Sequence, residues 1–225
     1  MGRRNNKISK PRKDTFAIVV DGKTEVWYFQ MLKRNESNLQ VNIEPKIPQK
    51  KKLYEQYKKI IELAEDYTKV FWIIDLDVVI AESKVTKKGE TNQIQKLSDY
   101  LDIIEKKYKN VISILNNPCL EYWFILHFNQ NTRYFPQCKE AEKELKKYLK
   151  DYEKTRKYFT KHDNDIYLRL KPKLTTALKN AKKTKRRSFE EIERAICEMN
   201  LFFKSDKIKK AIDIKENLTV NNLGQ

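Results

Sequence analysis

The first half of the chain alternates between short apolar runs and longer stretches in which apolar and polar residues mix. Three runs, at residues 15–20, 70–74 and 111–115, are rich in β-branched and aromatic residues, which favours extended strands. Nearly every position in these runs is apolar, as is typical of strands buried on both faces of a parallel sheet. We therefore predict three buried, parallel strands.

A fourth strand is predicted between the first two of these runs. Leu39, Val41 and Ile43 alternate with polar residues, which indicates a strand with one buried face. Pro45 follows at once, and we expect it to end the strand because proline cannot donate a backbone hydrogen bond. The predicted sheet thus has four strands.

Helical spacing of apolar residues fills the intervals between the strands. The expected helices cover residues 25–33, 53–64, 91–108 and 120–128, and a polar loop is expected at 79–90. An alternating order of strands and helices predicts an α/β fold with a mostly parallel, four-stranded sheet flanked by helices.

The second half of the chain is predicted to be helical and basic. Helices are expected at 139–149, around 174–181 and at 188–203, the last because Ser188 and Glu191 have the spacing of a capping box. We divide the chain into a flexible basic arm (1–13), an α/β core (14–135), a basic α-helical C-terminal extension packed on the core (136–215) and a polar tail (216–225).

The chain is strongly basic, with a formal net charge of +17 and a sequence pI near 9.6. Residues 139–187 contain 18 Lys or Arg against 7 Asp or Glu, a surplus of 11. Such a surplus points to a polyanionic partner, and the alternative is a solvated, lysine-rich surface. The candidate nucleic-acid contacts are Lys23, which could orient a phosphate, and the cluster of Lys182, Lys183, Lys185, Arg186 and Arg187.

The cysteines and the apolar runs exclude several classes of protein. The three cysteines are widely spaced and odd in number, and there are only two histidines, so we expect neither a disulfide framework nor a Cys/His zinc site. No apolar run approaches the roughly 18 residues that span a bilayer. The basic N-terminus has no apolar core of a secretory signal, so we expect a cytoplasmic protein with no membrane partner.

Acidic and amide side chains follow the ends of three predicted strands. In a parallel sheet these ends share one edge, where ligands bind. Clustered carboxylates repel one another unless a cation joins them, and oxygen ligands suit Mg²⁺ or Mn²⁺. A metal-bearing acidic edge on a basic protein is a plausible nuclease design. The residues concerned are Asp21, Glu25, Asp75, Asp77, Asn116, Asn117 and Glu121.

Each of these residues also has a structural explanation. Glu25 and Glu121 could merely complement the dipoles of the helices that they begin. The aromatic run Tyr122–Phe124 is expected in the core rather than stacked on bases. His127, a possible supporting residue together with Asn117, is expected to be a buried histidine with its hydrogen bonds satisfied.

Two further short runs resemble motifs of other protein families. Residues 22–24, Gly-Lys-Thr, resemble the end of a P-loop, but the first glycine of that motif is replaced by Ala17 within a strand, which excludes it. The run DLDVV at 75–79 resembles the nucleophile motif of haloacid-dehalogenase-type phosphatases. That family usually carries the motif on its first strand, so this is the weaker alternative.

The runs IVVDGKTEVWYF, WIIDLD and NNPCLEYWFILHF, with the later YLRLKPKLTTALKNAK, resemble the RloB-like family of prokaryotic defence-associated loci. The resemblance spans residues 16–183 and implies a Toprim-like fold. In such modules a glutamate follows the first strand, as Glu25 does, and a DxD motif follows a later strand, as Asp75 and Asp77 do. Glu121 is similar to the acid of the third family motif. Many Toprim enzymes have a further acid after the DxD motif, where this chain has Val78 and Val79.

The resemblance implies a nuclease that uses Mg²⁺ or Mn²⁺ to cleave RNA or DNA in anti-phage, abortive-infection defence. Asp75 and Asp77 would hold the metal, and Glu25 would be a further metal ligand or the acid/base. These three residues with Glu121 would form the catalytic set. A protein partner encoded in the same defence locus is a further expectation. The alternatives are a non-catalytic nucleic-acid-binding component and a dehalogenase-type phosphatase.

Overall fold

A computed structural model describes residues 15–20, 22–39, 42–46, 52–87 and 89–212. For 42–46 only the backbone is described. The predicted basic arm (1–13), Asp21 and the polar tail (216–225) lie outside the described residues.

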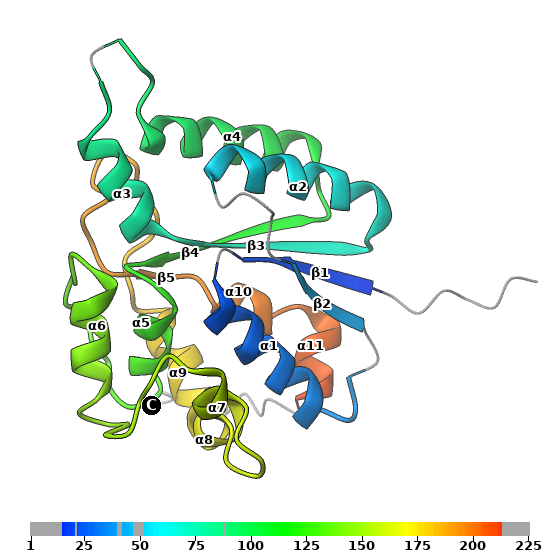
Figure 1. The fold of residues 1–225 in the computed structure, drawn as a ribbon. Helices are drawn as coiled ribbons and strands as arrows, with labels where there is room; N and C mark the ends of the chain where they lie inside the picture. The colour runs from blue at the N-terminus through cyan, green and yellow to red at the C-terminus, as the bar shows by residue number, and fades with distance from the viewer. Residues whose placement is uncertain (1–14, 21, 40–41, 47–51, 88, 213–225) are drawn as a thin grey trace, which may run out of the picture.

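A five-stranded sheet in the order β2-β1-β3-β4-β5 forms the centre of the molecule (Figure 1). The strands are β1 (Thr15–Val19), β2 (Asn42–Lys46), β3 (Lys69–Asp75), β4 (Val111–Asn117) and β5 (Ile196–Cys197). The first four are parallel, which confirms the predicted α/β fold with its mostly parallel sheet. The short β5, which the sequence did not predict, pairs antiparallel with β4.

Pro45 lies within β2, opposite Ile18 of β1, and does not end the strand. The prediction that it would was wrong. β2 is the outermost strand of the sheet, so one side of its backbone needs no partner strand. An edge strand tolerates proline for this reason.

Helices cover both faces of the sheet, and each face has its own hydrophobic core. Alternate residues of β1 and β3 enter opposite cores: Val19 and Trp72 face one, Ile18 and Phe71 the other. On the first face lie α2 (Leu53–Asp66), α3 (Leu76–Lys84) and α4 (Gln93–Lys107) (Figure 1). At 15 residues α4 is the longest described helix, and none of the described helices is long and apolar enough to cross a bilayer.

The second face carries α1, α5 and α10, and the other helices of this side pack around them. Their bounds are α1 (Lys23–Asn35), α5 (Leu120–Ile125), α6 (Cys138–Leu145), α7 (Arg156–Phe159), α8 (Ile166–Leu170), α9 (Leu174–Ala181), α10 (Asn200–Phe203) and α11 (Asp206–Ala211), with a 3₁₀ turn at Lys171–Lys173. Residues from both halves of the chain share this core, so the C-terminal segment completes the fold.

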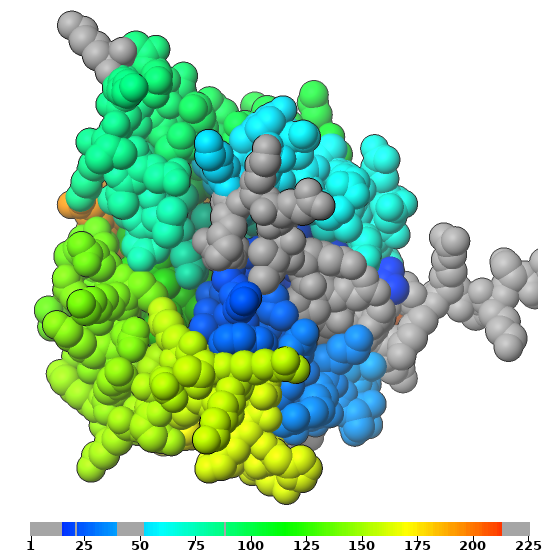
Figure 2. All heavy atoms as spheres, viewed as in Figure 1, coloured from blue at the N-terminus to red at the C-terminus, as the bar shows by residue number. Residues whose placement is uncertain are grey.

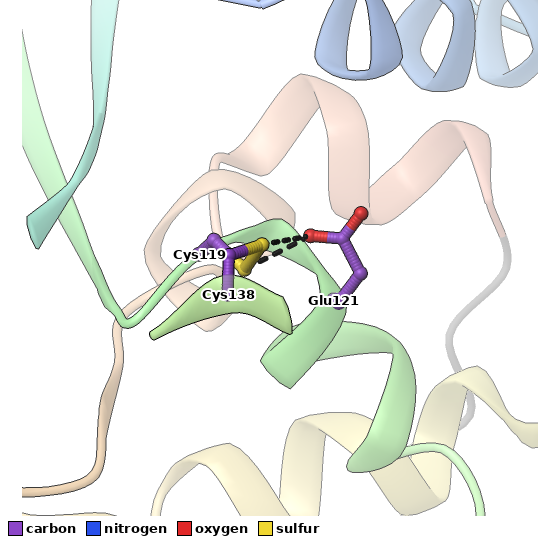
Figure 3. Close-up of side chains that lie close together, drawn as sticks. All are labelled: Cys119, Glu121 and Cys138. Carbon is purple, nitrogen blue, oxygen red and sulfur yellow. Dashed lines mark hydrogen bonds between the residues drawn. A yellow bond between two sulfur atoms is a disulfide. The ribbon is translucent and has the colours of Figure 1, made fainter. Parts of the chain in front are cut away.

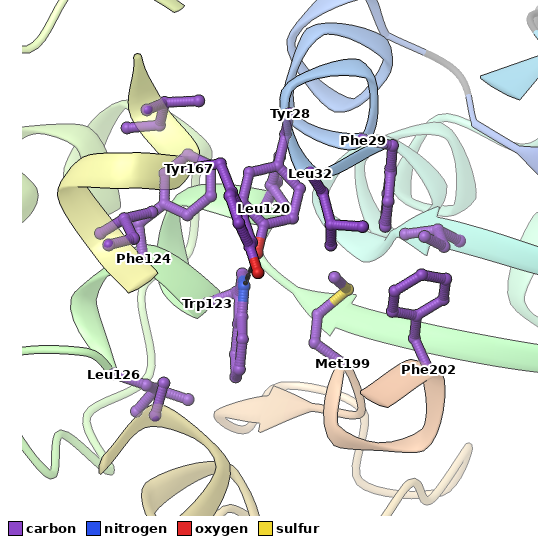
Figure 4. Packing of buried hydrophobic residues seen from close by; sticks show 14 of the residues in the cluster. Tyr28, Phe29, Leu32, Leu120, Trp123, Phe124, Leu126, Tyr167, Met199 and Phe202 are labelled. Atoms are coloured by element: carbon purple, nitrogen blue, oxygen red, sulfur yellow. Dashed lines mark hydrogen bonds between the residues drawn. The ribbon is translucent and has the colours of Figure 1, made fainter. Parts of the chain in front are cut away.

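Aromatic side chains dominate the core on this face (Figure 4). Trp123 is fully buried, and its Nε1 donates a hydrogen bond to the hydroxyl of Tyr28, 3.2 Å away. Tyr122 and Phe124 are also fully buried, which confirms that this aromatic run belongs to the core. The packing fixes the position of α5 and, with it, the residues at its start.

Helix α3 occupies much of the segment 79–90 that was predicted to be a loop, so that prediction was wrong. Leu76, Val79 and Ile80 have helical spacing and are buried in the first core. The helix begins directly after β3, with Asp75 as its N-cap residue. The consequence for the site is that Asp75 and Asp77 belong to different elements, a strand end and a helix.

The predicted helix at 188–203 was also wrong. The amide of Glu191 does donate to Oγ of Ser188, 3.3 Å away, as in a capping box. The chain then continues without helix to β5, and only Asn200–Phe203 is helical in this stretch. Pairing of Ile196 with Asn117 at the sheet edge outweighs the local helical preference.

Candidate functional site

Three adjacent parallel strands are each followed by a helix that has an acidic residue in its first turn. Glu25 follows β1 in α1, Asp77 follows β3 in α3, and Glu121 follows β4 in α5. Figure 1 shows α3, α5 and α6 together at the end of the sheet where β3 and β4 finish. The free N–H groups at a helix start favour negative charge nearby. The fold therefore repeats one acidic position along this edge.

Asp75 is the last residue of β3 and lies opposite Asn116 of β4. Asn116 is fully buried, and neither polar atom of its side-chain amide has a hydrogen-bond partner among the described residues. A buried amide without a partner is costly and uncommon in folded proteins. At the end of β4, next to Asp75, the side-chain oxygen and nitrogen of Asn116 are thus available to hydrogen-bond or bind a ligand.

Asp77 is partly buried and accepts two backbone hydrogen bonds. Its Oδ1 accepts from the amide of Val78 at 2.9 Å, and its Oδ2 accepts from the amide of Cys138 at 3.2 Å. Burial raises the pKa of Asp77 above its ordinary value, and the nearby charge of Glu121 adds to the rise. The two hydrogen bonds and Lys154 oppose it. The surrounding groups thus do not fully compensate the negative charge of the Asp77 carboxylate.

Glu121 is 1% exposed and is held by groups from a distant segment of the chain. The hydroxyl of Tyr152 donates to its Oε1 at 2.6 Å, and Nζ of Lys154 lies 2.8 Å from the same oxygen. Burial raises the pKa of the Tyr152 hydroxyl above its ordinary range, and the Glu121 charge adds to this. Sequence reasoning missed both Tyr152 and Lys154.

Glu25 is 4% exposed and completes this group of charges. Its Oε2 accepts a hydrogen bond from Thr24, and a methyl group added at Gly22 would lie only 2.1 Å from that oxygen. The carboxylate of Glu25 therefore packs against the Gly22 backbone, in space that a larger residue would fill.

Lys154 connects these acids electrostatically. Burial alone would lower the pKa of its ammonium, but the charge and hydrogen bond of Glu121, with the charges of Glu142 and Glu25, raise it above its ordinary value. Lys154 in turn lowers the pKa of Asp77. Three of the four predicted acids thus interact with one lysine. Figure 2 shows the start of α1, α3 and the segment around 138–160 meeting on one face.

The predicted metal ligands Glu25, Asp75 and Asp77 do not form a tight group of three. Among the residues that the structure describes, the group whose ligand atoms all lie within 4.8 Å of one another is Cys119, Glu121 and Cys138. A cation bound by the predicted acids would need side-chain movement or ligands from outside the described residues.

Cys119 and Cys138 form a disulfide, although no disulfide framework was predicted from the sequence. Packing of α5 against α6 joins two cysteines that are 19 residues apart. Both sulfurs lie 2.9 Å from Oε2 of Glu121 (Figure 3). Because disulfide sulfurs carry no hydrogen, these contacts become hydrogen bonds only when the cysteines are reduced.

The comparison with protein families decides the identity of the chain. The model of the RloB-like protein family matches residues 16–207. The chain belongs to the RloB-like family. The match covers all the acids described above, together with Lys154 and both disulfide cysteines. Comparison with curated proteins and with solved structures gave no match.

Two predicted supporting residues have structural roles in this RloB-like chain. The amide nitrogen of Asn117 donates to the carbonyls of Ile192 and Arg194, at 2.7 and 2.9 Å, and so holds the segment before β5. His127 is buried, with Nδ1 3.0 Å from the Trp123 carbonyl. Burial lowers the pKa of His127 to about 3. A histidine that stays neutral suits the predicted buried role, although its Nε2 has no hydrogen-bond partner in the described part of the chain.

The predicted nucleic-acid contacts of the RloB-like chain divide into exposed and internal side chains. Lys23, Lys182, Lys185 and Arg186 are exposed, and Lys183, also exposed, donates to Gln130 at 2.8 Å. Arg187 instead points inward: its Nε donates to Glu198 at 2.8 Å and its Nη2 to the Ser113 carbonyl at 2.9 Å. The structure thus gives Arg187 a role in joining the C-terminal segment to β4.

Proposed function

We propose that this RloB-like chain is a nuclease that uses a divalent cation to cleave phosphodiester bonds of RNA or DNA. The observation that carries the proposal is the grouping of Glu25, Asp77 and Glu121 about Lys154 at the carboxyl edge of three parallel strands. Buried and partly buried acids of like charge are expensive to bring together, so a fold that does so without function is disfavoured.

The chemical types of the donors at this edge, carboxylate and amide oxygens, suit a hard cation. Glu25, Asp75 and Asp77 would hold Mg²⁺ or Mn²⁺ through carboxylate oxygens, and the unpartnered oxygen of Asn116 lies beside Asp75. The rise in the pKa of Asp77 fits as well, because a cation would compensate its charge. A bound cation would supply positive charge to a phosphodiester and activate water for attack.

The chain's own residues have separable parts in this proposal. Lys154, held against Glu121, would place an ammonium group next to the negative charge that develops on the phosphate. Tyr152 fixes Glu121 from the buried side, so this carboxylate positions the lysine. Exposed cations, among them Lys182, Lys185 and Arg186, would bind the nucleic-acid backbone without reading its sequence.

We further propose that the activity serves anti-phage defence by abortive infection, with a protein partner from the same locus. Membership of the RloB-like family supports this step, because the resemblance of the sequence motifs to that family implies a role in defence. The high net positive charge of +17 fits a nucleic-acid substrate.

A non-catalytic nucleic-acid-binding component is the second candidate. It is favoured by one observation: Glu25, Asp75 and Asp77 do not form a close group of three ligands within the described residues, whereas Lys154 already compensates Glu121. In that case the acids and the lysine would only stabilise the fold.

Cleavage assays separate the two candidates. The purified protein is incubated with tRNA, single-stranded DNA and duplex DNA, with Mg²⁺, with Mn²⁺ and with a chelator. A nuclease predicts cation-dependent cleavage that Asp75→Asn abolishes while nucleic-acid binding survives. Asp102→Asn, which changes an exposed acid on α4, is the matched control and should cleave normally. Binding without cleavage under every condition would support the second candidate.

A further inference from the structure

We infer that Cys119 and Cys138 form a redox-active pair whose oxidation state controls how the acidic site is held. The disulfide joins the residue before α5 to the first residue of α6. The disulfide contacts the carboxylate of Glu121, which follows Cys119 by two residues. The backbone amide of Cys138 also donates a hydrogen bond to Asp77. The part of the inference that concerns catalysis rests on the proposed nuclease function.

The two sulfurs differ in their access to a reductant. Cys119 is 1% exposed, whereas Cys138 is only partly buried. Nζ of Lys154 lies 3.2 Å from the Cys138 sulfur, so its positive charge would attract an incoming thiolate. A small dithiol would therefore attack Cys138 and release Cys119.

The exchange balances without any further reactant. One thiolate of the dithiol forms a bond to the Cys138 sulfur as the bond between the two cysteines breaks, and Cys119 takes up a proton. The second thiol then closes a disulfide within the reductant and releases Cys138, which also takes up a proton. Two electrons pass from the dithiol to the cysteine pair.

Reduction alters both of the contacts that the pair makes with the acids. It removes the covalent link that holds the start of α6 close to α5, and the amide at that start donates to Oδ2 of Asp77. It also gives each sulfur a hydrogen, so that the thiols can donate to Oε2 of Glu121. The oxidised form thus fixes the Cys138 amide on Asp77, whereas the reduced form loosens this contact and adds thiol hydrogen bonds to Glu121.

A metal site made of the same three residues is the competing explanation of this cluster. Two thiolates and a carboxylate within 4.8 Å of one another could bind a soft cation. Lys154, however, places its ammonium 2.8 Å from Glu121 and 3.2 Å from Cys138, where it would repel that cation. The disulfide and the lysine together favour redox chemistry.

Thiol alkylation followed by mass spectrometry tests the redox part. We expect Cys119 and Cys138 to stay unlabelled when the untreated protein is unfolded in the alkylating reagent. Both should be labelled when the folded protein is first treated with dithiothreitol and then unfolded in the reagent. Cys197→Ala is the control, because Cys197 is buried and free and should leave this behaviour unchanged. Alkylation of the pair without a reductant, or failure of dithiothreitol to reduce it in the folded protein, would overturn the inference.

Amide hydrogen exchange tests the coupling without reference to activity. Reduction should make the Cys138 amide exchange several-fold faster, and the double variant Cys119→Ser, Cys138→Ser should match the reduced wild type. Equal exchange in both redox states would overturn the coupling.

If the protein cleaves nucleic acid, the reduced form should cleave it about two- to tenfold more slowly, the range for one lost hydrogen bond. Absence of cleavage in both states would count against the proposed function alone, because the exchange result decides the coupling.

Discussion

The ammonium group of Lys154 lies 2.8 Å from Oε1 of Glu121, a carboxylate that is almost completely buried. The pair joins the segment after α6 to the start of α5. Lys154 also interacts electrostatically with Glu25 and Asp77. One lysine from the basic half of the chain therefore compensates acids from three strand–helix junctions.

Replacing this lysine should destabilise the protein. In Lys154→Met the buried charge of Glu121 loses its ion-pair partner, and we expect a cost of about 1–3 kcal/mol in the free energy of unfolding. This is less than for a fully buried pair, because 37% of the Lys154 side chain is exposed. Urea unfolding measures the change, with Lys157→Met, at an exposed position of α7, as the control. Equal stability of the two variants would show that the pair contributes nothing.

Gly22→Ala should separate activity from stability. The new methyl group would displace the carboxylate of Glu25, the end of a flexible side chain, so little stability should be lost. The backbone at Gly22 is extended and accepts alanine without strain. We expect cation-dependent cleavage to fall as in Glu25→Gln, while the thermal midpoint changes little. A variant with full activity would show that the placement of Glu25 is unimportant.

Stability should depend on pH through His127. Burial keeps this histidine neutral in the folded protein, with a pKa of about 3 against 6.5 ordinarily. The unfolded chain therefore binds the extra proton as the pH falls below 6.5, and folding stability falls with it. Relative to His127→Gln, the wild type should lose up to about 2 kcal/mol between pH 7 and pH 5. Urea unfolding at both pH values measures the difference, and parallel curves would contradict a buried, neutral histidine.

Adjacent arginines in the basic cluster should behave differently. Arg187→Met removes hydrogen bonds to Glu198 and to Ser113, and should cost about 1–3 kcal/mol of stability. Arg186→Met, at an exposed position, should leave stability unchanged but weaken nucleic-acid binding and its salt dependence. Unfolding and binding measurements on both variants check this. Equal loss of stability in the two would refute the internal role of Arg187.

Much of the sheet could be predicted because its strands have nearly continuous apolar sequences. The run at 70–74 has no helical or alternating period, and burial on both faces is the physical reason. Parallel pairing then fixed which ends share an edge, so the positions of Glu25, Asp75, Asp77 and Glu121 at strand ends followed from topology. Whether these acids bind a metal remains a prediction.

Tertiary contacts decided what the sequence could not reveal. Nothing local distinguishes Lys154 from its many lysine neighbours, and only the folded chain brings it to Glu121. The capping signal at Ser188 is real, yet strand pairing at the sheet edge overrides it. The disulfide escaped prediction because its cysteines are joined by packing of α5 on α6 and not by any spacing motif.

Direct measurement of Mn²⁺ binding tests the central claim, that the acidic edge holds a divalent cation. Electron paramagnetic resonance of Mn²⁺ titrated into the purified protein distinguishes free from bound ion. The account predicts one saturable site that Glu25→Gln and Asp77→Asn each weaken strongly and that Asp102→Asn leaves intact. Binding that is absent from the wild type, or the same in all three variants, would contradict it.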